Sequence, residues 1–67
     1  MYDADKRALR DLQDAVHTED RTWARQAIDD LTLSYDGRVR DFGYRVQAGH
    51  VATEDLDSEI RKLRRGR

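Results

Sequence analysis

The chain has 67 residues, of which 40% are charged, and its formal net charge is −1. It contains no cysteine, which excludes a disulfide scaffold, a thiolate metal site and a cysteine nucleophile, and favours an intracellular, cytoplasmic protein. No apolar run approaches the roughly 18 residues of a membrane span, and Met1 precedes Tyr-Asp-Ala-Asp rather than a signal sequence. We therefore expect one small soluble domain with a thin core and no membrane contact.

The first predicted element is a helix over about residues 4–17. Asp3 or Asp5 is placed to cap its N-terminus. Its apolar residues recur at spacings of three and four, the pattern of one buried helix face: Ala8, Leu9, Leu12, Ala15 and Val16.

The second predicted element is a single long helix over about residues 19–48, with Thr18 as its N-cap. One apolar stripe continues along its whole length: Ala24, Ala27, Ile28, Leu31, Tyr35, Val39, Phe42 and Val46. At 100° per residue these positions stay within an arc of about 120°, so a straight helix would keep them on one side. Gly37 and Gly43 oppose this, since each costs roughly 1 kcal/mol in a helix interior.

Two alternatives for this stretch stay open. A break at Gly37 would give two helices, but it would place Arg38 and Arg40 in a first turn, where positive charge is disfavoured. Asp36-Gly37 is also a strong β-hairpin signal. A two-residue hairpin loop would pair Leu33 with Arg40 and set arginine on the face that needs burial, so we disfavour strands here.

The last predicted element is a helix over about residues 54–65. Gly49 is a suitable residue to end the helix before it, and Thr53 is placed to cap the new one. Leu56, Ile60 and Leu63 form a narrow apolar seam.

These elements predict an all-α fold, a small helical bundle of a short helix, a long central helix and a short helix, with a break of the central helix at Gly37 as the alternative. Two short helices along one face of a continuous rod would make a layer only two helices thick. Such a layer leaves apolar stripes uncovered, and we therefore expect a homodimer. The broken form would instead be a compact monomer of three or four helices.

One strip of side chains lies opposite the apolar stripe of the continuous helix: Leu33, Gly37, Arg40 and Tyr44. Tyrosine and arginine are common in binding hot spots, and a glycine between them lets another backbone approach closely. We interpret this strip as a candidate surface for binding a protein partner.

The end of the chain is basic. Five cationic residues fall in positions 61–67, namely Arg61, Lys62, Arg64, Arg65 and Arg67. They leave residues 1–60 with a net charge of −6. The simplest interpretation is structural: these cations complement the dipole of the last helix. The functional interpretation is that they contact nucleic acid or an acidic partner.

The sequence predicts no catalytic residue, metal site or cofactor. His17 and His50 are the only histidines, and they lack the partners that general base catalysis or metal binding requires. Our leading hypothesis is a non-enzymatic protein that binds a larger protein and modulates it, as an inhibitor, adaptor or small phage or bacterial accessory protein. The alternatives are a nucleic-acid-associated regulator acting through the basic tail, and a structural subunit of a larger assembly.

Overall fold

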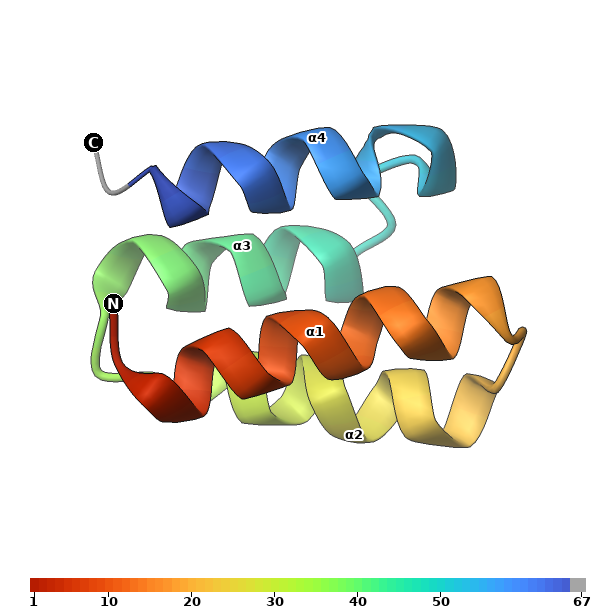
Figure 1. The fold of residues 1–67 in the computed structure, drawn as a ribbon, viewed down its shortest axis with the longest axis horizontal. Helices are drawn as coiled ribbons and strands as arrows, with labels where there is room; N and C mark the ends of the chain where they lie inside the picture. Colours follow the sequence, from red (N-terminus) through yellow and green to blue (C-terminus); the bar gives the residue numbers. More distant parts are fainter. Residues whose placement is uncertain (66–67) are drawn as a thin grey trace.

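The computed structural model describes residues 1–65 and has four helices connected by short links (Figure 1). They are α1 (Asp3–His17), α2 (Arg21–Thr32), α3 (Gly37–Gln47) and α4 (Thr53–Arg64). No strand occurs in the described part of the chain, so the all-α prediction is confirmed and the hairpin at Asp36-Gly37 is excluded.

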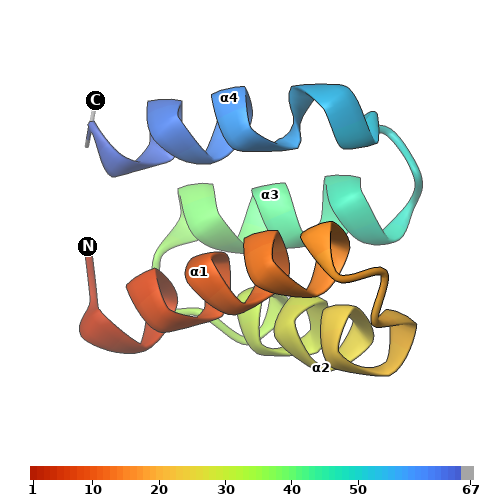
Figure 2. The ribbon, with the colours of Figure 1, turned by 45° about the vertical axis from the view of Figure 1, so that its right-hand side comes forward.

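The four helices run up and down in alternation. α1 packs against α2 and against α4, and α2 packs against α3. Figures 1 and 2 show that the N-terminus, the α2–α3 turn and the last turn of α4 lie at one end of the bundle. The other end holds the α1–α2 and α3–α4 links. Residues far apart in sequence therefore meet at the first end.

The long central helix is not formed. The helix ends at Thr32, residues 33–36 form a turn, and α3 begins at Gly37. The break at Gly37 that we kept as an alternative is therefore the observed arrangement, although its cause is not the glycine alone. Asp36 is the N-cap of α3, and its side chain accepts a hydrogen bond of 2.9 Å from the backbone N–H of Arg38.

The charge of Arg40 does not prevent the break, because Arg40 contacts the end of α2. Arg40 does lie in the first turn of α3, but its Nη1 donates to the Ser34 carbonyl oxygen at 3.3 Å. That places its charge near the C-terminal end of α2, where a cation is favoured. The unfavourable position of the Arg40 charge at the start of α3 is therefore offset by its favourable position at the end of α2.

Gly43 permits α3 to lie directly against α2. A Cβ atom at this position would be 2.9 Å from Leu31 Cβ and 3.0 Å from the Thr32 backbone nitrogen. Real Cβ atoms do not approach so closely, so only glycine fits here. Gly43 would weaken a continuous helix, but it allows α3 to fold back against α2.

Several helix ends differ from the predicted caps. Asp20, not Thr18, caps α2, and it accepts a hydrogen bond of 2.9 Å from the Trp23 N–H. Thr18 instead follows α1 and donates its hydroxyl to the Asp14 carbonyl. The N-caps of α1 and α4 are Tyr2 and Ala52, with no side-chain cap, so neither the aspartates nor Thr53 fill those roles.

The predicted stop at Gly49 is confirmed. Its φ is +79°, its N–H donates to the Val46 carbonyl, and the N–H of His50 donates to the Arg45 carbonyl. These two bonds make a Schellman motif. The same pattern ends α1, where Glu19 holds the left-handed position with φ +57°.

The core takes the predicted faces of all four helices, with one exception. Its buried residues are Ala8, Leu9, Leu12, Ala27, Leu31, Val39, Phe42, Leu56 and Ile60. Tyr35, which the continuous stripe placed in the core, is 90% exposed because it lies in the turn rather than in a helix. The four helices cover most of the apolar stripes, with Val16, Ala24, Ile28 and Val46 partly buried, and the two-helix-thick layer from which we predicted a dimer is absent.

Candidate functional site

Large apolar side chains are exposed at the end of the bundle that holds the N-terminus. We call this group the end face, and it consists of Met1, Tyr2, Leu33 and Tyr35. They are 41%, 58%, 78% and 90% exposed, respectively. Scattered exposed apolar residues are ordinary, but a group from two separate chain segments at one end is the kind of surface that partners use.

A buried polar contact joins these two segments. Ser34 is 8% exposed and its hydroxyl donates to Asp5 Oδ2 at 2.8 Å. The same hydroxyl accepts a 3.0 Å hydrogen bond from the Asp36 N–H. The rings of Tyr2 and Tyr35 meet edge to face, with centroids 6.4 Å apart. The exposed side chains therefore stand on a fixed turn.

The predicted strip is divided between two parts of the molecule. Leu33 lies at the C-cap of α2 and lines a shallow groove of about 340 Å³ together with α1 residues. Gly37, Arg40 and Tyr44 follow one face of α3 at spacings of three and four. Tyr44 is 52% exposed, and Gly37 is half-buried, where a Cβ would make only an ordinary contact with the end of the Arg40 side chain at 3.6 Å. Arg40 is the member that reaches back to the turn.

The basic residues of the tail lie mostly on α4. Arg61, Lys62 and Arg64 occupy its last turn, Arg65 is the C-cap, and all four are exposed. Arg67 lies outside the described residues. Glu54 and Asp55 occupy the first turn, so the charges of this helix complement its dipole.

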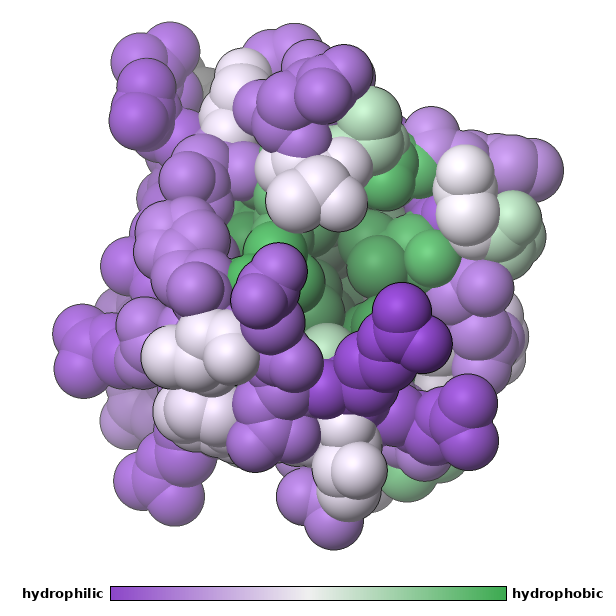
Figure 3. All heavy atoms as spheres, turned by 90° about the vertical axis from the view of Figure 1, so that its right-hand side faces the viewer, coloured by the Kyte–Doolittle hydropathy of each residue, from purple (hydrophilic) through white to green (hydrophobic). Residues whose placement is uncertain are grey.

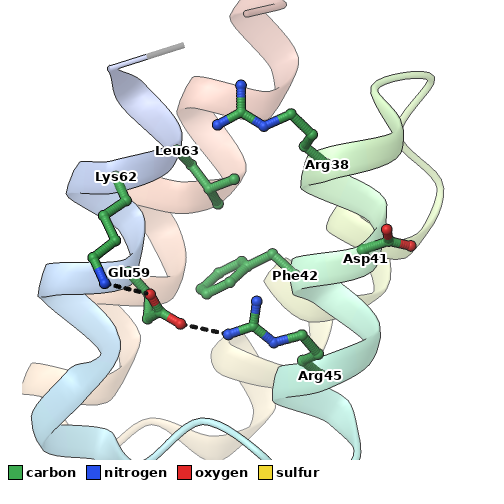
Figure 4. Close-up of a pocket in the computed structure, with 7 residues that line it drawn as sticks. All are labelled: Arg38, Asp41, Phe42, Arg45, Glu59, Lys62 and Leu63. Carbon is green, nitrogen blue, oxygen red and sulfur yellow. Dashed lines mark hydrogen bonds and ion pairs between the residues drawn. The ribbon is translucent and has the colours of Figure 1, made fainter. Parts of the chain in front are cut away.

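A groove of about 320 Å³ separates α3 from α4 (Figure 4). Its lining residues are Arg38, Asp41, Phe42, Arg45, Glu59, Lys62 and Leu63. Figure 4 shows Phe42 and Leu63 facing each other across the space, while the Asp41 carboxylate points away from it. Three cations thus surround an apolar centre, with Glu59 as the one carboxylate directed inward among the lining residues.

Glu59 is held by two cations from different helices. Arg45 Nη2 donates to Glu59 Oε1, and Lys62 Nζ lies 3.6 Å from Oε2. The hydrogen bond from Arg45 lowers the pKa of Glu59 below its ordinary value of 4.5, and the charges of Arg45 and Lys62 act in the same direction. This carboxylate is therefore ionised at neutral pH.

An apolar hollow opens at the opposite end of the bundle, and Figure 3 shows apolar atoms gathered there inside a polar rim. Two adjoining grooves of about 500 and 550 Å³ form it, with Val16, Ala24, Ile28 and Val46 among their linings. The rim carries arginines and acidic residues together. It therefore has no preference for a partner of either charge.

Sequence reasoning identified Leu33 but missed the other residues of the end face, Met1, Tyr2 and Tyr35. Tyr35 was assigned to the core, and neither Ser34 nor the burial of Asp5 was foreseen. One local signal for the turn exists, since aspartate is a strong N-cap residue and Asp36 precedes α3 directly. The contact between Asp5 and Ser34 joins residues 29 positions apart and leaves no local signal.

Comparison with protein-family models, curated proteins and solved structures finds no match to this chain. Within residues 1–65, no three histidine, aspartate or glutamate side chains are placed to hold a metal ion together. No helix in the same part of the chain is both long and apolar enough to cross a membrane.

Proposed function

We propose that this chain is a non-enzymatic, intracellular interaction protein that binds a larger protein through its end face and modulates it. The observation that carries the proposal is the exposure of Leu33 and Tyr35, at 78% and 90%, on a turn fixed by the buried Ser34–Asp5 hydrogen bond. Ordering such side chains costs little entropy on binding when the backbone beneath them is already fixed.

The composition of the end face supports a protein partner. Tyr2 and Tyr35 supply large amphipathic rings, and Arg40 lies beside the same turn. Tyrosine and arginine are the residue types that most often dominate protein–protein binding energy. Gly37 and Tyr44 would extend this surface along α3.

The proposal is tested by partner capture with purified variants. The wild-type chain should retain a protein from its source cells in a fixed stoichiometry. Leu33→Asp and Tyr35→Ala should each weaken that complex about tenfold or more when it is reconstituted from pure components. Arg10→Ala, which truncates an exposed side chain of α1, is the control and should bind normally.

Tyr44→Ala measures how far the surface extends along α3. A loss comparable with that of Tyr35→Ala would include the α3 face in the interface. A partner that binds both end-face variants as tightly as the wild type would contradict the proposal. Self-association, as a homodimer, stays a prediction that light scattering on the purified chain measures directly.

A further inference from the structure

We propose that the groove between α3 and α4 binds an acidic protein segment that carries an apolar side chain. This inference rests on the proposed function, because it names the chemistry of a segment of the protein partner. It concerns a different surface from the end face, with its own residues and its own test.

The charge of the groove favours an acidic ligand. Arg38, Arg45 and Lys62 line it. Of the two acidic lining residues, only Glu59 points inward (Figure 4). An excess of cations around a concave surface attracts acidic segments and speeds their association.

The way Glu59 is held shows that these cations can bind a carboxylate. Arg45 comes from α3 and Lys62 from α4, and both contact the same carboxylate group. Their side chains stay 49% and 72% exposed, so a partner carboxylate can reach them. Glu59 therefore occupies the position of a ligand group and competes with an incoming acid.

The apolar centre distinguishes a protein segment from nucleic acid. The apolar surface between the cations comes mainly from the half-buried Leu63, since Phe42 is only 2% exposed, and it suits an aliphatic side chain flanked by carboxylates. Its volume of about 320 Å³ holds a short segment rather than a duplex. Nucleic-acid-binding domains are also usually basic overall, whereas this chain has a net charge of −1.

The test is fluorescence polarisation with a labelled synthetic peptide of alternating aspartate and leucine, and with a short single-stranded DNA as the competing probe. Lys62→Glu should weaken peptide binding about tenfold. Lys6→Glu makes the same change on an exposed part of α1 and should leave the affinity close to that of the wild type. Replacing the leucines of the peptide by serine should also weaken binding.

A second matched pair tests the competition by Glu59. Glu59→Gln releases Arg45 and Lys62 and should tighten peptide binding, while Glu54→Gln, an equal change of charge at the far end of α4, should have a smaller effect. Circular dichroism of each variant confirms that it is folded.

Three results would overturn the inference. They are absence of peptide binding to the folded wild-type chain, equal losses in the Lys62→Glu and Lys6→Glu variants, and tighter binding of the DNA than of the peptide. The third result would assign the groove to nucleic acid. None of them bears on Leu33 or Tyr35, so the proposed function would be judged separately by its own variants.

Discussion

Helices α1, α2 and α3 are held together differently from α4. α2 and α3 pack closely at Gly43, and the buried Ser34–Asp5 hydrogen bond ties α1 to the turn between them. α4 packs mainly on α1, and its polar ties are partly exposed: Asp57 accepts from Gln13 at 3.0 Å and lies 3.4 Å from His17, and Glu59 contacts Arg45. α4 still buries Leu56 and Ile60 in the core, but its contact with α3 is loose enough to leave a groove between the two helices.

The largest expected effect compares two leucine truncations. Leu31 is fully buried, and Leu31→Ala should lower the free energy of unfolding by about 2–5 kcal/mol. Leu63 is half-buried beside the open groove, and Leu63→Ala should cost roughly 1 kcal/mol or less. Urea unfolding followed by circular dichroism measures both, and equal losses would mean that α4 is packed as tightly as α2.

Two glycine substitutions test the closeness of α2 and α3. Gly43→Ala should destabilise the fold by about 1–3 kcal/mol despite the better helix propensity of alanine, because the added Cβ would overlap Leu31. Gly37→Ala is the matched control, since its Cβ would meet only the flexible end of Arg40 at 3.6 Å. It should change stability by less than about 1 kcal/mol. A stabilised Gly43→Ala variant would contradict the close contact.

Ser34→Ala tests the polar anchor of the turn. Removing the hydroxyl leaves the buried Asp5 carboxylate without this donor, and the expected loss is about 1–2 kcal/mol. The two side chains share one hydrogen bond, so an Asp5→Asn, Ser34→Ala double variant should lose less than the two single changes combined. Strictly additive losses in thermal or urea unfolding would show that the two side chains do not interact.

The smallest expected effect concerns the tie between α3 and α4. The folded-state pKa of Glu59 lies below 4.5, so its ion pair contributes fully at neutral pH and is lost as the pH falls through that lowered pKa. The stability difference between the wild type and Glu59→Gln should therefore shrink in acid. When Arg45 is replaced by methionine, the effect of Glu59→Gln on stability should lose most of its pH dependence. If the effect of Glu59→Gln on the otherwise wild-type protein does not change with pH, the ion pair is excluded.

The sequence predicted most of the buried helix faces, but it did not predict the turn at residues 33–36 that brings α2 and α3 together. Helical spacing placed Leu9, Leu12, Leu31 and Phe42 in the core correctly, because each short helix keeps its own periodicity. The same periodicity also runs unbroken from Ala24 to Val46, so it could not distinguish one rod from two helices folded together.

Contacts between residues distant in sequence determine whether this segment forms one continuous helix or two helices joined by a turn. The Ser34–Asp5 bond links α1 to the turn, and the space at Gly43 exists only once α3 lies on α2. Neither is visible in local propensity. Of the candidate surface residues, Leu33 and Tyr44 are exposed as predicted, whereas Tyr35 became the most exposed of the large apolar residues because it left the helix.

The chain folds back between Leu33 and Asp36, and the whole arrangement of α2 and α3 depends on this turn. Nuclear Overhauser contacts in the solution structure test it most directly. The folded-back pair predicts contacts between the Leu31 side chain and the Gly43 α-protons, because a Cβ built at Gly43 lies 2.9 Å from Leu31 Cβ. In a continuous helix these residues would be about 18 Å apart. Absence of those contacts, with helical sequential contacts running through residues 33–36, would contradict the account.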